Sequence, residues 1–350
     1  MNNCKILNQI VNKLFSLVAF ILVFGIFRGY SQESGKADTV MLRFAFYNVE
    51  NFFDPYPNSK AGYNEFDPGG IRGWNRQKYN AKRDNIYRVI TALGGWNMPA
   101  LVAFAEIENR QVLEAVIRET PLNGKGFDII HYDSKDERDI DVGLIYDKML
   151  LKPLLTKSIK VSLPDTNNPT RDILYVKFLV FRDTLHLFVN HWPSRYGGLL
   201  ESAPYRYSAA ETLSHHIDSL CSGRGSPHIL IMGDFNDNPA DISISLLRGA
   251  GDSCLRQLVP HSANTKVNGT YKYKQLWEYF DQILVSKSML KGSIWINKPV
   301  YQVFDEDFLL EPDERYVGYK PYRTFIGFKY HGGFSDHLPV YIDIYSINSE

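Results

Sequence analysis

Residues 229–239 read I-L-I-M-G-D-F-N-D-N-P, and the other motifs of the chain are interpreted relative to this stretch. An uninterrupted apolar run bounded by turn residues is typical of a strand that is buried on both faces. Gly233 allows a sharp exit, and the Asn-Pro pair ends the strand. The strand therefore presents Asp234 and Asn236 at a sheet edge, where a carboxylate and an amide suit a hard metal ion and a phosphate. The alternative is a simple turn whose side chains bond their own backbone.

Other apolar runs end in the same way. Strands are predicted at 40–49, 100–105, 127–132, 141–146, 174–181, 185–190, 277–285 and 338–345, and helices at 79–93, 109–120 and 205–220. Six strands end, or nearly end, in groups that suit a metal or a phosphate: Asn48 and Glu50, Glu106, His191, Asp234 and Asn236, Asp281, and Asp336-His337. One such ending is ordinary, but six predict an active site where the strands end. Residues 54–76 and 301–333 are predicted to be loops.

The composition predicts one globular domain preceded by an N-terminal targeting segment. The chain has 350 residues, 44% of them hydrophobic, which is enough to form one core. Its formal net charge is zero, and no run of lysine and arginine forms a basic stripe. Lys5 and Lys13 precede an apolar run at 14–27, the anatomy of a signal peptide and short for a membrane span. We expect residues 1–31 to be a signal peptide, with an uncleaved anchor as the alternative, and residues 32–350 to form one domain.

Export of the protein would determine its location and whether its cysteines can form a disulfide. A signal peptide predicts a secreted, periplasmic or cell-surface protein. Only Cys221 and Cys254 follow the segment, enough for one disulfide, and the sequence leaves open whether it forms.

The ordered motifs resemble a known superfamily. They are N-V-E at 48–50, Glu106, N-H-W-P-S-R at 190–195, G-D-F-N at 233–236, D-Q-I-L at 281–284 and S-D-H at 335–337. Their order resembles the endonuclease/exonuclease/phosphatase superfamily, the DNase I-like phosphoesterases, and most of all its secreted bacterial members. The resemblance implies an α/β fold: a four-layer αββα sandwich with two mixed sheets packed face to face and helices outside. It also implies divalent-metal-dependent cleavage of a phosphate ester with Mg²⁺, or Mn²⁺ instead.

The resemblance further implies a role for each matching residue. The implied metal ligands are Glu106, Glu50 and Asp336; the implied substrate-binding residues are Asn48, Asn236 and Arg195; the implied catalytic residues are His191, Asp234, Asp281 and His337. Asp234 would orient or deprotonate the attacking water, and Asp281 would keep His337 protonated. His191 would bind the phosphate or protonate the leaving oxygen. Two alternatives remain. Arg195 is then a solvated loop arginine, and Asn51 or Asp54 takes the place of Glu50.

The chain departs from the family in two respects: its aromatic loops at 54–76 and 301–333 match no family motif, and the second difference concerns Arg138. Related secreted members carry Arg-Gly-Ile-Asp where this chain has R-D-I-D at 138–141, so a substrate role for Arg138 does not carry over.

The expected function is that of a secreted phosphodiesterase, most simply a nuclease, whose partner is a phosphate-ester substrate such as nucleic acid. The alternative is a sphingomyelinase-like lipid phosphodiesterase or a phosphomonoesterase for small substrates. Exposed aromatic side chains would serve a lipid surface or stack on bases: Trp74, Tyr316, Tyr319 and Tyr322. Membrane contact is expected only with an uncleaved anchor or a lipid substrate, and no stable protein partner is expected. An inactive surface binding module is disfavoured, because the expected catalytic residues are all present.

Overall fold

The computed structural model describes residues 38–56, 65–67, 69–165, 169–223, 225–249 and 254–348. The predicted signal peptide lies outside these residues, as does part of the predicted 54–76 loop. Val40–Ser346 forms one compact unit. Within the described residues, no helix is long and apolar enough to span a bilayer.

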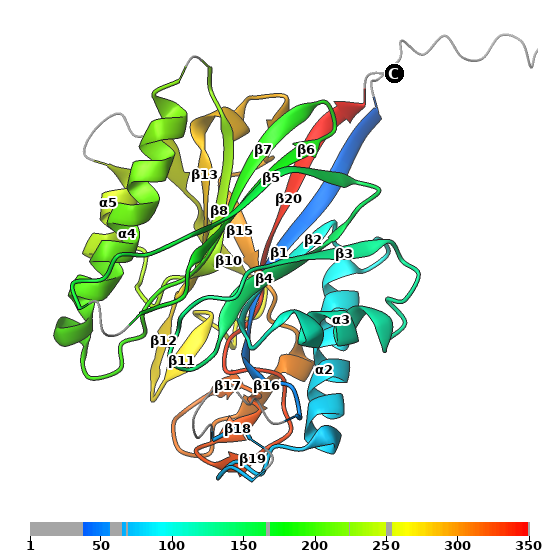
Figure 1. Ribbon diagram of the computed structural model, residues 1–350, viewed down its shortest axis with the longest axis vertical. Coiled ribbons are helices and arrows are strands. Elements are labelled where there is room, and N and C mark those ends of the chain that lie inside the picture. The colour runs from blue at the N-terminus through cyan, green and yellow to red at the C-terminus, as the bar shows by residue number, and fades with distance from the viewer. Residues whose placement is uncertain are drawn as a thin grey trace, which may run out of the picture. The chain divides into compact units, whose positions relative to one another are not determined.

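Two mixed sheets form the centre of this unit (Figure 1). The first contains β1 Asp38–Phe52, β2 Leu101–Ile107, β3 Phe127–His131, β4 Asp141–Asp147, β10 Val259–Ser262, β14 Ile294–Trp295, β15 Val300–Val303 and β20 Val340–Asn348. Its order is β10-β15-β20-β1-β2-β4-β3, with β14 also on β20. The second contains β5 Leu151–Ile159, β6 Ile173–Val180, β7 Asp183–His191, β8 His228–Asp234, β9 Leu255–Gln257 and β13 Asp281–Ser286. Its order is β5-β6-β7-β8-β13-β9.

Helices cover the outer faces of both sheets. They are α2 Arg76–Gly94 and α3 Arg110–Arg118 on one side, and α4 Leu199–Cys221 and α5 Ile242–Arg248 on the other (Figure 1). Apolar side chains of the two sheets share one core, in which the rings of Tyr146 and Phe178 are 5.4 Å apart. A second core joins the outer face of β8 to α4, where Ile231 packs with Leu213. The predicted αββα sandwich is therefore confirmed.

Local sequence signals explain several of these elements. The Asn75 side chain accepts a 3.0 Å hydrogen bond from the Lys78 amide and caps α2. Every residue of β8 is buried, as its uninterrupted apolar run predicts. Gly233 has a different role from the predicted sharp exit. A Cβ there would lie 2.3 Å from the Asn190 carbonyl oxygen, so glycine lets β7 and β8 approach closely.

Two expectations about strands were wrong, and one long strand was not predicted. The predicted strand 277–285 is two strands, β12 Leu276–Glu278 and β13, so Asp281 begins a strand instead of lying inside one. The predicted loop 301–333 holds the end of β15 and the short strands β16 Leu310–Pro312, β17 Tyr319–Pro321, β18 Phe325–Ile326 and β19 Lys329–Tyr330. Strand β5 was not predicted, because it is an edge strand whose residues are mostly exposed or half-buried and show no regular alternation.

The disulfide that the sequence left open is present. Cys221 at the end of α4 is bonded to Cys254, just before β9, across a separation of 33 residues. The bond ties the outer helix to the second sheet.

Candidate active site

The strand register gathers the site at one end of the second sheet. His191 and Asp234 end the parallel strands β7 and β8 and lie opposite each other. Asp281 begins the antiparallel strand β13 and also lies opposite Asp234. The start of an antiparallel strand therefore meets the ends of two parallel strands, and three predicted catalytic residues are neighbours.

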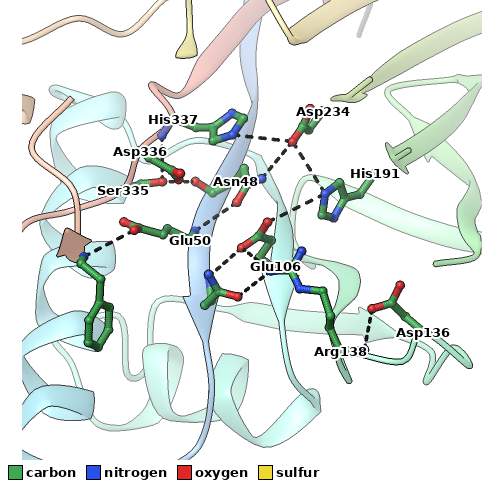
Figure 2. Close-up of polar contacts among 12 residues, drawn as sticks. Asn48, Glu50, Glu106, Asp136, Arg138, His191, Asp234, Ser335, Asp336 and His337 are labelled. Carbon is green, nitrogen blue, oxygen red and sulfur yellow. Dashed lines mark hydrogen bonds and ion pairs between the residues drawn. The ribbon is translucent and has the colours of Figure 1, made fainter. Parts of the chain in front are cut away.

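The first sheet supplies the other half of the site. Asn48 Nδ2 in β1 donates a 3.0 Å hydrogen bond to Asp234 Oδ2 in β8. The side chains that face this point come from both sheets and from the segment before β20: Asn48, Glu106, His191, Asp234 and His337 (Figure 2). The predicted rim is thus one cluster that both sheets build.

Strained backbone positions concentrate here. Glu50, Asn51, Glu106 and Asn236 have φ angles of 52°, 55°, 61° and 50°, a left-handed conformation that costs a non-glycine residue about 1 kcal/mol or more. The register of β1 with β2 breaks between Asn48 and Phe52, and that of β2 with β4 breaks beside Glu106. Such bulges re-aim side chains at functional sites. The irregular strand ends therefore direct polar groups into the cluster.

His337 forms the expected pair with Asp281. Their Nδ1 and Oδ2 atoms are 2.7 Å apart, and His337 Nε2 lies 3.7 Å from Asp234 Oδ2. Burial opposes a charged imidazole, but Asp281 and Asp234 outweigh it and hold the pKa of His337 well above its usual range. Asp281 is fully buried, and its Oδ1 has no hydrogen-bond partner within the described residues, so the imidazolium is its countercharge.

Asp234 lies at the centre of the cluster. Burial raises its pKa to about 6, while the nearby His337 opposes that shift. Its Oδ1 accepts a 2.9 Å hydrogen bond from the Asn236 amide, and its Oδ2 accepts the bond from Asn48. Hydrogen bonds to both oxygens fix the orientation of this carboxylate, as a group that positions a nucleophile requires.

His191 and Glu106 form the opposite wall. His191 Nε2 is 4.0 Å from Glu106 Oε1 and 3.7 Å from Asp234 Oδ2. Burial, with the nearby Arg171 and Arg138, lowers the pKa of His191 well below its usual range, so this imidazole is neutral. Its Nδ1 meets no acceptor in the described part of the chain, which places the single proton on Nε2, facing the carboxylates.

Glu50 and Asp336, whose expected role as metal ligands stays a prediction, both contact an arginine. Arg323 Nη2 lies 3.2 Å from Glu50 Oε1 and 2.8 Å from Asp336 Oδ2. Glu50 Oε2 also accepts a 2.6 Å hydrogen bond from the Thr324 amide. Burial and Asp336 raise the pKa of Glu50. Burial also raises that of Asp336, but Arg323 and His337 bring it below its ordinary value. These contacts fasten the 323–325 segment to the site.

Asn236 and Arg195, both expected to bind substrate, are linked to each other. Arg195 Nε donates a 2.8 Å hydrogen bond to the Asn236 carbonyl, and its Nη2 pairs with Asp241 Oδ2 at 2.8 Å and Asp237 Oδ1 at 3.3 Å. The Asn236 side chain donates to the Trp192 carbonyl at 3.0 Å. The guanidinium therefore holds the loop of Asn236 in place, and its substrate-binding role stays a prediction.

Comparison with known proteins agrees with this geometry. Residues 43–346 match the sequence profile of the Endonuclease/Exonuclease/phosphatase family. The chain belongs to this family. It is accordingly a phosphoric ester hydrolase of the DNase I-like fold. No curated protein is similar enough to the chain to count as a match.

Solved structures with this fold are distant in sequence. A Bacteroides thetaiotaomicron protein of the family has a TM-score of 0.54 and 14% identity, covering 89% of this chain and 100% of that chain. A humanized D. rerio TDP2 has a TM-score of 0.53 and 12% identity, with coverages of 87% and 98%. The human Nocturnin catalytic domain with bound sulfate has a TM-score of 0.51 and 14% identity, with coverages of 88% and 96%.

Enzymes of the endonuclease/exonuclease/phosphatase family depend on a divalent metal, and the buried side chains of Asp234, Asp281 and His337 bring ligand atoms within reach of one ion. Glu106 Oε2 accepts a 2.9 Å hydrogen bond from the Asn51 amide, whereas Oε1 accepts none from the described residues. An open carboxylate oxygen beside further oxygen donors suits a hard cation. Glu106 would thus hold the ion together with water and substrate oxygens.

Three residues near the site, Arg323, Ser335 and Tyr271, were missed by the sequence analysis, and a fourth, Arg138, was named there without a role. Arg323 joins Glu50 to Asp336, and Ser335 Oγ donates a 2.7 Å hydrogen bond to the Asn48 carbonyl. Arg138 Nη2 donates a 2.7 Å hydrogen bond to Asn51 Oδ1 and lies 3.6 Å from Glu106 Oε2. The Tyr271 ring packs 4.8 Å from that of His337. Only Ser335 stood in a recognised motif, S-D-H, which could have drawn attention to it.

One expected surface aromatic is buried. Trp74 is 0% exposed, its Nε1 donates a 3.0 Å hydrogen bond to the Phe53 carbonyl, and its ring meets Phe66 edge-on. Tyr316, Tyr319 and Tyr322 are only half-buried. Trp74 therefore cannot contact a lipid surface or a base.

Proposed function

We propose that this protein is an exported phosphodiesterase that hydrolyses nucleic acid with Mg²⁺, or with Mn²⁺ in its place. The observation that carries the proposal is the chain of contacts from Asp281 through His337 to Asp234, 2.7 Å and 3.7 Å long. It sets a buried imidazolium beside a carboxylate whose pKa is about 6. A fixed cation and a base, side by side, are what attack of water on a phosphate ester requires.

Each of these residues has a defined task in that reaction. Asp234 orients the attacking water and accepts its proton. His337, protonated and held by Asp281, faces the phosphate and stabilises the negative charge that grows on its oxygens. Asn48 and Asn236 donate to the phosphate or hold Asp234, and neutral His191 binds the phosphate by donating a hydrogen bond from Nε2. Glu106 would hold a divalent ion, which would supply polarisation of the phosphoryl oxygens.

Three observations support the finer parts of the proposal. One structurally similar protein is a D. rerio TDP2 whose structure contains a single-strand DNA product, with a TM-score of 0.51 and 13% identity. The signal-peptide pattern of residues 1–31 supports export. The disulfide between Cys221 and Cys254 also favours an oxidising compartment.

Plasmid DNA tests the proposal directly. The protein lacking residues 1–31 is incubated with supercoiled plasmid or RNA, with Mg²⁺ or Mn²⁺, and with EDTA as the control. We expect metal-dependent nicking that EDTA abolishes and that His337→Ala lacks. Intact plasmid and RNA alongside hydrolysis of bis-p-nitrophenyl phosphate would keep the chemistry and reject nucleic acid as the substrate.

A second candidate substrate is a phospholipid, and one surface feature favours it. Tyr196, Leu199 and Leu200 follow the motif that contains His191 and are 94%, 51% and 80% exposed. Apolar side chains beside a catalytic residue suit a lipid surface. Sphingomyelin vesicles in the same assay distinguish the two substrates. Release of phosphocholine without nicking of DNA would favour a lipid phosphodiesterase. Activity on small monoesters alone would favour a phosphomonoesterase.

A further inference from the structure

The carboxylates around the proposed metal site divide into two groups. Glu106 has one oxygen that accepts no hydrogen bond from the described residues. Both oxygens of Glu50 accept hydrogen bonds. Oε2 accepts one from the Thr324 amide at 2.6 Å, and Oε1 accepts one from Arg323 at 3.2 Å and one from the Phe325 amide at 3.4 Å. Since a divalent ion needs carboxylate oxygens that it can reach, Glu50 is not available to an ion while these donors are in place.

One nitrogen joins Glu50 to Asp336. Arg323 Nη2 lies within hydrogen-bond distance of both carboxylates, at 3.2 Å and 2.8 Å, in the way that a bridging cation would. Glu50 is 3% exposed, so its charge needs a partner inside the protein. Arginine is the suitable partner, because its guanidinium stays protonated when buried and binds carboxylates in a fork.

The segment that carries Arg323 is fastened to the core. Lys82, 1% exposed in α2, donates hydrogen bonds to Thr324 Oγ1 and, at 2.5 Å, to the Phe334 carbonyl. The Glu50 backbone is held in its left-handed conformation at the β1 bulge. The backbone next to Arg323 and the backbone of Glu50 are therefore both fixed, and the Arg323 side chain, 36% exposed, spans from one to the other.

We propose that Arg323 is an internal cation that occupies the position of a second metal ion between Glu50 and Asp336. The site then binds one divalent ion, at Glu106, and the single positive charge of the arginine bridges Glu50 and Asp336. This inference rests on the proposed function, because that function assigns a divalent ion to Glu106. It assigns Arg323 as a positioning residue and makes Glu50 its anchor in place of a metal ligand.

Counting bound ions tests this assignment without any activity assay. The probe is Mn²⁺, counted by electron paramagnetic resonance and calorimetry on the protein lacking residues 1–31. His131, Asp133 and Asp141 also bring ligand atoms within reach of one ion, so every measurement uses an Asp133→Asn background. Asp133 is exposed, and this change leaves the core intact.

Five proteins, the parent and four variants in that background, give the expected pattern. The parent binds one Mn²⁺ per chain, Glu106→Gln loses it, and Glu50→Gln keeps it with an affinity within a few fold. Arg323→Met, which keeps the length of the side chain and removes its charge, binds one additional Mn²⁺. The Glu50→Gln/Arg323→Met double variant loses the additional ion, because the bridging pair is then broken.

Two outcomes overturn the assignment. One is a parent protein that binds two ions, one of which Glu50→Gln removes. The other is a folded Arg323→Met that binds no additional ion. If Arg323→Met does not fold, the parent, Glu50→Gln and Arg323→Lys still decide, since all three should bind one ion. A parent that binds no Mn²⁺ at all, or loses none in Glu106→Gln, contradicts the metal site of the proposed function instead.

Discussion

Asp281 Oδ2 and His337 Nδ1 are 2.7 Å apart, although 56 residues separate them in the chain. The pair forms because β13 begins at Asp281 and the segment before β20 passes beside it, where His337 bridges to Tyr271. The Tyr301 hydroxyl donates to the Asp281 carbonyl at 3.1 Å and holds the strand start. Asp281 therefore orients the imidazolium and, together with Asp234, keeps it charged.

Replacing that carboxylate should disable the histidine. In Asp281→Asn the pKa of His337 falls, and we expect turnover to drop about 10²- to 10⁴-fold, the usual contribution of a positioned acid or base. The control is Asp343→Asn, which breaks a part-exposed pair with Arg43 on the first sheet. Steady-state kinetics on plasmid or bis-p-nitrophenyl phosphate measures both. Turnover in Asp281→Asn close to that of the control would show that the pair is only structural.

Glu106→Gln should separate metal binding from folding. The change removes the carboxylate that faces His191, so we expect Mn²⁺ affinity and turnover to fall by orders of magnitude while the midpoint of thermal unfolding without metal stays nearly unchanged. The matched control is Glu114→Gln on α3, where the carboxylate pairs only with Arg110 and Arg118. Calorimetry with Mn²⁺ provides the measurement. A variant that still binds the ion as the wild type does would remove Glu106 from the metal site.

How far the sequence predicts this site depends on the kind of element involved. Asp234 and His191 were placed correctly at strand ends, because a buried strand leaves a strong apolar run that stops where the polar group begins. The contact of Asp281 with His337 was also predicted, because the family resemblance pairs these two residues and a buried carboxylate requires a partner.

Loop residues escaped the same reasoning. Arg323 contacts Glu50 across 273 residues, and nothing in the local pattern of a loop indicates such a contact. Trp74 was assigned to the surface because its surroundings are rich in glycine and polar residues, yet Phe53 and Phe66 bury it. Strand periodicity reports which face is buried, whereas a loop has no period from which burial can be read.

The Tyr271 hydroxyl is positioned to contact substrate. Its ring is held between His337 and Phe280, at 4.8 Å and 5.3 Å, and its hydroxyl has no hydrogen-bond partner within the described residues. Burial and the charges of Asp336 and Asp234 raise its pKa, so it stays a donor. Tyr271→Phe should lower turnover about 10- to 10²-fold, the value of a hydrogen bond to a charged group, without changing the unfolding midpoint.

A neighbouring tyrosine provides the control for that experiment. Tyr273 lies on the same strand, β11 Tyr271–Tyr273, and is 58% exposed. Tyr273→Phe should leave turnover unchanged. Equal turnover in the two variants would mean that the Tyr271 ring matters only for packing against His337.

The disulfide should stabilise the fold without assisting the reaction. Closing a loop of 33 residues restricts the unfolded chain, and the chain-entropy model gives about 3–4 kcal/mol for this length. We expect Cys221→Ser/Cys254→Ser to lose roughly that much unfolding free energy in urea titrations and to keep its turnover at moderate temperature. An unchanged midpoint would indicate that the unfolded chain is already restricted there.

Acid should destabilise the protein through a buried histidine far from the metal site. His186 in β7 lies with its Nδ1 2.8 Å from the Tyr175 hydroxyl, and burial lowers its pKa to about 4. In the unfolded chain the value is about 6.5. Between these values the unfolded state binds more protons, so the unfolding free energy is highest above about pH 6.5 and falls as the pH drops toward about 4.

A non-titrating side chain at this position tests the sign of that effect. His186→Gln should lose less unfolding free energy than the wild type when the pH is lowered through this window. A residual slope should remain, because burial lowers the pKa of His191 as well. His215→Gln, which replaces an exposed histidine on α4, should follow the wild type. Urea titrations at several pH values compare the three proteins, and equal slopes in His186→Gln and the wild type would show that His186 does not couple protonation to folding.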